Sequence, residues 1–293
     1  MRRLITAALM LVTVAIAGFG QIPQTGLVLW VPFSDSSYQD SSVSHVTFTA
    51  VPRLAPPTPT AGHTGDANSA YSFIQGQSKW FEGSDSLMPQ GAHDRTLCAW
   101  IATTGPGTRA NIIGYGDTAK GNACHFYLTQ NGNNKYLKLS NRSDSISYSC
   151  AGHALSATTN GTWLHVCAVI SGTTTLLYVD GAQVASATIS SWNTTRRGLG
   201  IGGAYITPYN GGLSWEGKLD NIALYNRALS STEIQEVYNE SYTHARPSVY
   251  STRMSKTYEA KTGYYLVSGR KIHEINLVDI VTCSQIKIEL VMK

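Results

Sequence analysis

The stretch GKLDNIALYNRALSSTEIQEVY, residues 217–238, opens as a strand and closes as a short helix. Apolar residues alternate through its first part, and a single acid, Asp220, lies among them. Ser230 has a Glu three residues later, which is the capping-box spacing at the start of a helix. Leu229 and Val237 fall on one side of that helix, so we expect it to dock on the domain. A carboxylate in a strand that reads as buried needs a partner, which makes Asp220 the first candidate functional residue.

Working outward from this stretch, the chain shows the pattern of an all-β protein. Short runs of alternating apolar residues recur with turn signals between them. The clearest are GLVLWVPF (26–33), RTLCAWIAT (95–103), CHFYLTQNGNNKYLKLS (124–140), TWLHVCAVIS (162–171) and TTLLYVDGAQVASATI (174–189). Many strands followed by one helix predict a β-sandwich with a terminal helix. Trp30, Trp100 and Trp163 are the tryptophans that we assign to its core.

Composition excludes some classes of function. Charged residues make up 14% of the 293 residues, against about 25% in an average soluble domain. The net charge of +4 is spread along the chain without a cluster of Lys and Arg, so nucleic acid is not expected as a partner.

Residues 1–20 have the three-part form of a secretory signal peptide. Two arginines precede an apolar run from Leu4 to about Ala17, and small residues close the run. We therefore expect a secreted or cell-surface protein whose mature chain carries no transmembrane segment. The composition changes again after residue 243, where a basic, polar stretch reads as a linker. The resulting domain prediction is a signal peptide (1–20), a β domain (21–243), and a linker with a C-terminal tail for sorting or attachment (244–293).

Five cysteines remain in the exported chain, and an odd number leaves at least one of them without a partner in the chain. Cys98 and Cys167 lie within apolar strand patterns, where we expect buried thiols. Cys124 and Cys150 flank a predicted hairpin and are the preferred disulfide pair. Cys283 lies in the tail.

Four stretches resemble the laminin-G-like domains of the concanavalin A-like lectin/glucanase superfamily. GLVLWVPFSDSSYQDSS (26–42) resembles the opening strand and its turn, and RTLCAWIAT resembles a core strand. GTWLHVCAVISGTTTLLYVDGAQVA (161–185) and GGLSWEGKLDNIALYNRALSSTEIQEVY (211–238) resemble the W-x-H-V strand with its hairpin and the closing signature. The resemblance covers about residues 24 to 240. It implies an all-β, two-sheet antiparallel jelly-roll β-sandwich.

The resemblance also offers a role for Asp220. Related sandwiches hold a calcium ion with an aspartate of the last strand and carbonyl groups near the first. Asp220 matches that aspartate, and Asp40 lies near the turn that would supply a second oxygen. Calcium takes six to eight oxygen ligands, which carboxylates and turn carbonyls supply. The alternative is that Asp220 binds neighbouring backbone amides and no metal.

Hydrolysis of glycosides is not favoured by the acids present. Retaining glycosidases need two carboxyl groups about 5 Å apart, and related enzymes place them at alternate positions of one strand. Here Glu82 and Asp85 are three residues apart in a predicted turn, and Glu216 and Asp220 are four residues apart, across a glycine. His165 lies in mid-strand, where a structural role is expected. We therefore expect no catalytic residues.

Aromatic residues give the better functional signal. The loops between residues 192 and 215 gather Trp192, Asn193, Tyr205, Tyr209, Asn210 and Trp215. Aromatic faces and amide side chains together suit the binding of sugars, although packing at the sandwich edge is an equal alternative. The preferred hypothesis is an exported, non-catalytic module that binds glycans or other cell-surface or extracellular ligands. The alternatives are a structural or adhesive protein that contacts other proteins, and a polysaccharide-degrading enzyme.

Overall fold

The computed structural model describes residues 22–51, 56–74, 79–103, 109–117, 119–131, 134–149, 162–203, 214–243, 266–267 and 270–271. The chain divides into two units, Met1–Thr243 and His244–Lys293. The division falls where the composition changes. In the second unit the structure describes only a pair of short strands, β16 (Leu266–Val267) and β17 (Arg270–Lys271). The predicted signal peptide lies outside the described residues.

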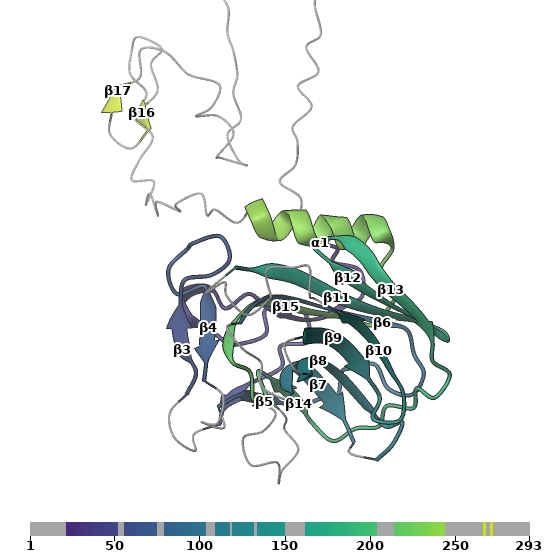
Figure 1. Cartoon of the computed structure of the whole chain (residues 1–293). Coiled ribbons are helices and arrows are strands. Elements are labelled where there is room, and N and C mark those ends of the chain that lie inside the picture. Colours follow the sequence, from purple (N-terminus) through teal and green to yellow (C-terminus); the bar gives the residue numbers. More distant parts are fainter. Residues whose placement is uncertain are drawn as a thin grey trace, which may run out of the picture. The chain divides into compact units, whose positions relative to one another are not determined.

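The first unit is a sandwich of two antiparallel sheets, which Figure 1 shows as facing layers. Sheet A has the order β13-β12-β11-β6-β15-β4-β3, and β1 also pairs with β15. Its strands are β1 (Leu27–Val31), β3 (Thr58–Thr60), β4 (Ala70–Phe73), β6 (Arg95–Ala102), β11 (Leu164–Ser171), β12 (Thr174–Val179), β13 (Ala182–Thr188) and β15 (Gly217–Tyr225).

Sheet B has the order β10-β9-β8-β7-β14-β5-β2. Its strands are β2 (Thr49–Ala50), β5 (Phe81–Gly83), β7 (Ala110–Gly116), β8 (Ala123–Asn131), β9 (Asn134–Ser140), β10 (Ser145–Ser149) and β14 (Leu199–Ile201). A 3-10 turn, η1 (Ser34–Ser36), follows β1. The predicted two-sheet antiparallel sandwich is confirmed, and its first and last strands lie side by side because β1 pairs with β15.

The core lies between the sheets and follows the period of two of a strand. Leu97, Ala99 and Ile101 of β6 point into it, as do Phe126 and Leu128 of β8. The residues between them point to the outer faces of the sheets. Each strand therefore contributes one set of side chains to the core and a second set to an outer face.

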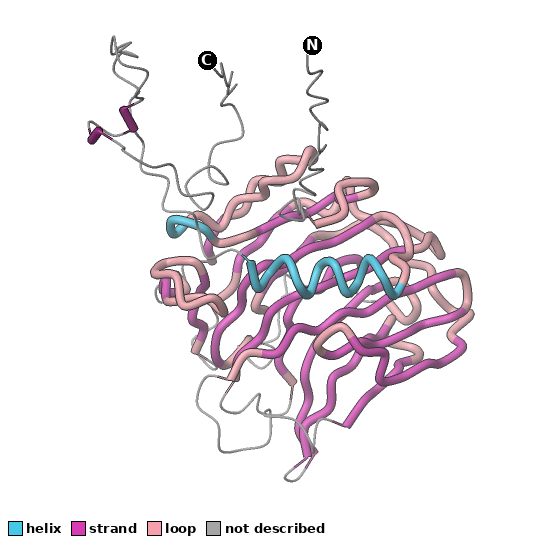
Figure 2. The backbone as a smooth tube through the Cα atoms, turned by 90° about the horizontal axis from the view of Figure 1, so that it is seen from above, coloured by secondary structure: helices cyan, strands magenta, loops and turns pink. Residues whose placement is uncertain are grey.

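The helix α1 (Ser231–Thr243) covers part of the outer face of sheet A, as Figure 2 shows from above. Ile234 and Val237 pack with residues of that face, including Tyr178 and Val169. The predicted capping box is present. The Ser230 hydroxyl accepts a hydrogen bond from the amide of Glu233 at 3.2 Å, and the Glu233 carboxylate accepts one from the amide of Ser230 at 2.9 Å. These bonds satisfy two amide groups that a helix start otherwise leaves unpaired.

The tryptophan assignments are confirmed only in part. Trp100 is buried, but it lies on the outer face of sheet A, beside Tyr238 of α1. Trp30 and Trp163 are only partly buried. The physical reason is strand alternation, since the neighbours of Trp30 and Trp100 on either side already point into the core. Sequence periodicity separates the two faces of a strand without saying which residues a helix or loop will cover.

The cysteine pairing also needs correction. Cys98 and Cys167 lie directly opposite each other on β6 and β11 and form a disulfide, with their Cα atoms 4.2 Å apart. Cys124 is a buried thiol, and Cys150 and Cys283 lie outside the described residues. The expectation of two buried thiols at Cys98 and Cys167 was therefore wrong. The register between two distant strands brings the two residues together, and the spacing of cysteines along the chain does not reveal that register.

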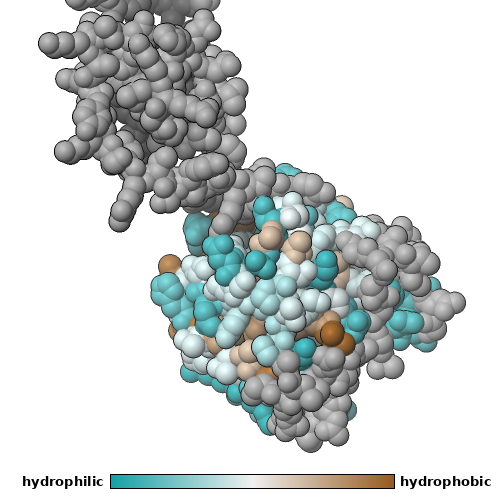
Figure 3. Space-filling view, turned by 90° about the vertical axis from the view of Figure 1, so that its left-hand side faces the viewer, coloured by the Kyte–Doolittle hydropathy of each residue, from teal (hydrophilic) through white to brown (hydrophobic). Residues whose placement is uncertain are grey.

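The surface of the sandwich is largely polar. The face turned toward the viewer in Figure 3 is mostly hydrophilic or neutral, with hydrophobic residues scattered singly. The large hydrophobic side chains that are exposed in the described part of the chain are Val43, Ile74 and Leu87. None of the described helices is long and apolar enough to cross a membrane.

Candidate functional site

The loop residues that the sequence singled out are only partly on the surface. Trp192 and Trp215 belong to the core between the sheets, with 4% and 0% of their surface exposed. Their predicted role as sugar-stacking residues is therefore corrected, because neither ring presents a face to solvent. Asn193 is exposed, and its side chain donates a hydrogen bond to the Asn122 side chain at 3.2 Å. The remaining three, Tyr205, Tyr209 and Asn210, lie outside the described residues.

Asp40 organises the turn that follows the first strand. Its Oδ1 accepts hydrogen bonds from the amides of Trp30 and Ser42, at 2.9 and 2.8 Å. Its Oδ2 accepts bonds from the Ser42 hydroxyl and the Val46 amide, both at 2.9 Å. The side chain is buried. Four donors around one carboxylate hold the chain between β1 and β2 in place.

Asp220 points to the outer face of sheet A and meets a histidine 157 residues earlier in the chain. Oδ2 of Asp220 accepts two hydrogen bonds from His63, from Nδ1 at 2.6 Å and from the backbone amide at 3.1 Å. Its Oδ1 is buried without a hydrogen bond. The loop approaches so closely that a Cβ on Gly62 would lie 2.5 Å from Oδ2, so only glycine fits there. Burial raises the pKa of Asp220, and the donors of His63 oppose that effect.

These two carboxylates do not fit the calcium site that the resemblance implied. The oxygens of Asp40 each accept two hydrogen bonds. One oxygen of Asp220 is occupied by His63, which leaves a single carboxylate oxygen at that position. Calcium requires six to eight oxygen ligands, and an imidazole N–H aimed at the carboxylate competes with a cation. The histidine was missed because His63 lies in a Pro- and Gly-rich loop with no motif to mark it.

The aromatic groups around Asp220 form a layer under α1. The ring of His63 stacks on Trp100, with centroids 4.4 Å apart, and Trp100 stacks on Tyr238 at 5.7 Å. His165 lies beside both Trp100 and Tyr238. Burial, aided by the charge of His63, lowers the pKa of His165 to about 3. A neutral imidazole packed under a helix is structural, as the sequence predicted.

The acids considered for catalysis have separate structural partners. Glu82 accepts a hydrogen bond from the Trp80 indole at 2.8 Å on β5. Asp85 accepts one from the backbone amide of Arg197 at 2.8 Å. Asp220 belongs to the other sheet and is bound to His63.

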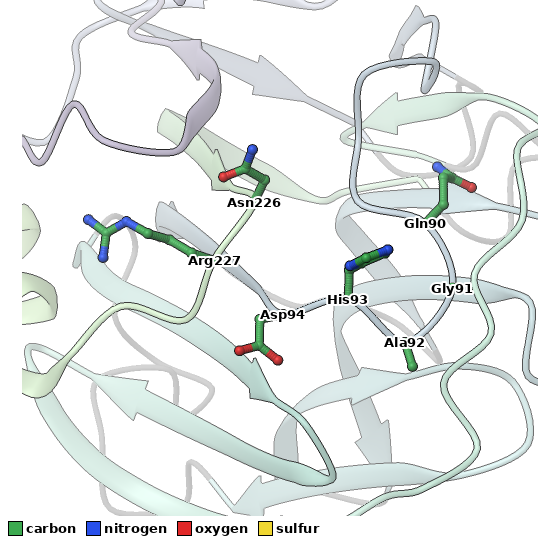
Figure 4. Close-up of a pocket in the computed structure, with 7 residues that line it drawn as sticks. All are labelled: Gln90, Gly91, Ala92, His93, Asp94, Asn226 and Arg227. Atoms are coloured by element: carbon green, nitrogen blue, oxygen red, sulfur yellow. The ribbon is translucent and has the colours of Figure 1, made fainter.

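The described part of the surface contains an open groove with a volume of about 680 Å³. It is lined by two segments, Gln90–Asp94 before β6 and Asn226–Arg227 after β15, and we call it the rim groove. Figure 4 shows Asn226 and Arg227 on one side, with Gln90 and His93 on the other. The lining is rich in amide, imidazole and carboxylate groups. The Oε1 atom of Gln90 is buried and accepts no hydrogen bond.

A buried arginine fixes one wall of the rim groove. Arg95 is completely buried, and its guanidinium donates five hydrogen bonds at 2.8–3.0 Å to uncharged groups: the carbonyls of Pro89, Gly91 and His93 and the hydroxyls of Tyr115 and Thr194. Gly91 also pairs with Thr194 through two backbone hydrogen bonds. The conformation of this wall is therefore set by the interior of the domain.

The opposite wall is fixed by the start of the helix. Arg227 makes two hydrogen bonds to the Glu233 carboxylate, at 2.9 and 2.6 Å, and a third to the carbonyl of Thr25. These bonds give Arg227 a structural role. The pairing lowers the pKa of Glu233 to about 2, chiefly through the hydrogen bonds from Arg227. Both walls are thus held by hydrogen bonds, and Asn226 and His93 are exposed.

The rim groove suits the binding of a small polar ligand. Its groups both donate and accept hydrogen bonds, as recognition of an uncharged polar molecule requires. The sequence did not reveal it, because Gln90, His93 and Asp94 form no motif and meet Asn226 only in the folded chain. Asn226 does lie inside the closing stretch with which the sequence analysis began.

Fold and groove together define a β-sandwich domain of the jelly-roll type with a polar site at its rim. The chain belongs to the concanavalin A-like lectin/glucanase superfamily, because the family model Laminin_G_3 matches residues 75–235, more than half of its length. The expected family is therefore confirmed. No curated protein shows a significant sequence match to the chain.

Solved structures with a similar fold include two toxin binding domains and one domain of an arabinanase. The binding domain of Paraclostridial Mosquitocidal Protein 1 matches with a TM-score of 0.55 and 12% identity, over 74% of this chain and 53% of that one. The botulinum neurotoxin serotype D binding domain matches with a TM-score of 0.52 and 14% identity, over 74% and 52%. Domain 4 of AbnA, an extracellular arabinanase from Geobacillus stearothermophilus solved with arabinotriose, matches with a TM-score of 0.52 and 16% identity, over 72% and 98%. The chain spans about half the length of the two toxin domains.

Proposed function

We propose that this protein is an exported, non-catalytic binding module that recognises carbohydrate through the rim groove. The observation that carries the proposal is the groove itself, an open hollow of about 680 Å³ lined by amide, imidazole and carboxylate side chains on walls held by hydrogen bonds. Sugar hydroxyl groups both donate and accept hydrogen bonds, and preorganised polar groups of both kinds bind them at a low entropic cost.

Three further observations support this proposal. The similar domain 4 of the arabinanase was solved in complex with arabinotriose, and two other similar structures are toxin binding domains. The acids that could serve a glycosidase are engaged separately, Glu82 by Trp80 and Asp220 by His63. The first 20 residues have the form of a signal peptide, which favours a site of action outside the cell.

A glycan array with the full chain tests the proposal. We expect at least one oligosaccharide to bind, and we expect Asn226→Ala or His93→Ala to weaken its binding at least tenfold. Both side chains are exposed, so neither substitution should change the melting temperature. Asn193→Ala is the matched control, because Asn193 is an exposed asparagine outside the groove.

The outcomes separate the competing functions. Loss of binding in Asn193→Ala alone would move the site to the loops between residues 192 and 215. An array without any bound glycan would overturn carbohydrate recognition and favour an adhesive role toward other proteins. Release of reducing sugar from a polysaccharide would show an enzyme instead.

A further inference from the structure

Arg95 lies behind one wall of the rim groove and carries a positive charge into the interior. In the described part of the chain, all of its hydrogen bonds go to uncharged groups, three main-chain carbonyls and two hydroxyls. The Cys124 thiol also lies near the guanidinium, but burial raises the pKa of this thiol and of the Tyr115 hydroxyl, so both stay neutral. A buried charge without an opposite charge is costly, and it acts strongly on the groups around it because the interior screens it less than water does.

The three carbonyls that Arg95 binds set the direction of the amides that follow them. In a planar trans peptide the N–H points opposite to the C=O. Each carbonyl faces the guanidinium, so the next amide points away from it, toward the side on which this segment lines the rim groove. These amides belong to Gln90, Ala92 and Asp94, and within the described residues they make no hydrogen bond. A Cβ on Gly91 would meet nothing within 4 Å, so the segment is open on this side.

Strand register gives independent evidence for the direction of the Asp94 amide. The Cα atoms of Cys98 and Cys167 are 4.2 Å apart, which is the spacing of an antiparallel pair that exchanges no hydrogen bonds. The N–H of Cys98 therefore points to β15 and not to β11, and amides at even steps along β6 point the same way. The register of β6 and β15 places Arg227 opposite Asp94, and both residues line the rim groove. The Asp94 amide thus points across the groove.

The one carboxylate in the lining is held on another side. Oδ1 of Asp94 accepts a hydrogen bond from the amide of Gly172, between β11 and β12, at 2.7 Å. Figure 4 shows this carboxylate turned away from Gln90 and His93. Its negative charge nevertheless lies at the groove, where it opposes a bound anion and offers a way to test for one.

We propose that the ligand of the rim groove carries an oxyanion group, a carboxylate or a sulfate, that is bound by the main-chain amides of the segment Gln90–Asp94. Amides only donate hydrogen bonds, and an oxyanion only accepts them. The charge of Arg95 polarises these peptide groups from behind, and polarised amides that converge on one space favour an anion. Arg95 is therefore a positioning residue, which fixes the amides without touching the ligand. The exposed side chains of the groove remain for the hydroxyl groups of the sugar.

This inference rests on the proposed function and names the class of saccharide, an acidic one. A glycan array of matched pairs tests it with the full chain, each uronate oligosaccharide beside its methyl ester and each sulfated sugar beside its desulfated form. We expect at least one acidic member to bind about tenfold more tightly than its neutral partner, because hydrogen bonds to a charged acceptor are the stronger ones. The uronate and sulfate arms distinguish the two sources of the oxyanion.

Asp94→Asn separates the charge at the groove from the net charge of the chain. It keeps an oxygen that can accept from Gly172 but removes a negative charge, so it should strengthen binding of the acidic member about threefold and leave its neutral partner unchanged. Asp66→Asn is the matched control, because Asp66 lies in the loop before β4, outside the groove, and its substitution changes the net charge equally.

Arg95→Met removes the buried charge. A merely structural role for Arg95 would weaken acidic and neutral members alike, whereas the proposed role predicts that the ratio of their affinities falls toward one. Should this variant not fold, as circular dichroism would show, Asp94→Asn decides. Equal binding of acidic and neutral members, or an acidic preference that neither variant changes, would overturn this inference and leave carbohydrate binding standing. An array without any bound saccharide would overturn both proposals.

Discussion

At the scale of single residues, the acid in the closing strand is explained by a histidine. Asp220 would be costly in a strand that is buried on both faces, since an uncompensated buried carboxylate strongly destabilises a fold. His63 offsets that cost with two hydrogen bonds and covers the carboxylate with its ring. The pair ties the loop before β4 to the last strand of the sandwich, the strand against which β1 also pairs.

Loss of His63 should therefore weaken the fold. We expect His63→Ala to lower the free energy of unfolding by about 1–3 kcal/mol, because the Asp220 carboxylate loses a donor while it stays buried. Urea denaturation monitored by tryptophan fluorescence measures this change. His93→Ala is the matched control, since His93 is exposed and its removal should have little effect. Equal stability of the two variants would show that His63 contributes nothing to the strand.

The donors around Asp40 and Asp220 also predict the response to calcium. Ligands that bind only the folded state raise the melting temperature. Because these carboxylates are satisfied largely by hydrogen bonds, we expect the same melting temperature in millimolar calcium and in excess chelator. Differential scanning fluorimetry measures both. A calcium-dependent rise that Asp220→Ala abolishes would restore the metal site implied by the family resemblance.

At the scale of elements, the central strands of sheet A are buried on both faces. All eight residues of β6 are buried, because the core covers one side and α1 with the loop around His63 covers part of the other. Because both faces are covered, the ring of His165 in β11 is buried in the outer layer, and the disulfide beside it is buried as well. The disulfide joins β6 to β11, the strands that form the middle of this layer.

The burial of His165 makes stability depend on pH. The folded state keeps this imidazole neutral down to about pH 3, whereas the unfolded chain binds a proton below its ordinary pKa of about 6.5. The stabilisation is therefore complete above about pH 6.5 and is lost as the pH falls toward 3, by up to about 1.4 kcal/mol per pH unit. Urea midpoints between pH 7 and 4 measure the slope.

His165→Gln is the variant that isolates this contribution. It removes the titrating group, so the dependence of unfolding free energy on pH should become shallower than in the parent protein. The remaining slope should include His125, whose pKa is also lowered to about 3 by burial and by the nearby arginines. An unchanged slope in His165→Gln would mean that His165 titrates normally in the folded state.

At the scale of the whole molecule, the sandwich and its covering helix form one unit. Every described strand of the two sheets lies before α1, which ends the unit at Thr243. The charged groups that hold the rim, Arg95 and the Arg227–Glu233 pair, also belong to this unit. The residues that line the rim groove all belong to this unit.

Deletion of residues 246–293 should leave the sandwich folded. We expect the truncated chain to keep the melting temperature of the parent and its binding to the glycan array, because all elements of the two sheets are retained. A tail that serves sorting or attachment would show itself in cells, where the truncated protein should be folded but retained. An insoluble truncated chain would instead make the tail part of the fold.

The sequence by itself determined the family, the two-sheet architecture and the capping box of α1. These features depend on local spacing and periodicity, which a sequence displays directly. The tertiary structure decided the rest. It places Trp192 and Trp215 in the core and Trp100 on an outer face of sheet A. It also joins Cys98 to Cys167 in a disulfide. It also brought His63 to Asp220, and Asn226 to the loop before β6. These contacts depend on strand register and on which faces a helix or loop covers, and neither can be read from neighbouring residues, because both arise between segments far apart in the chain.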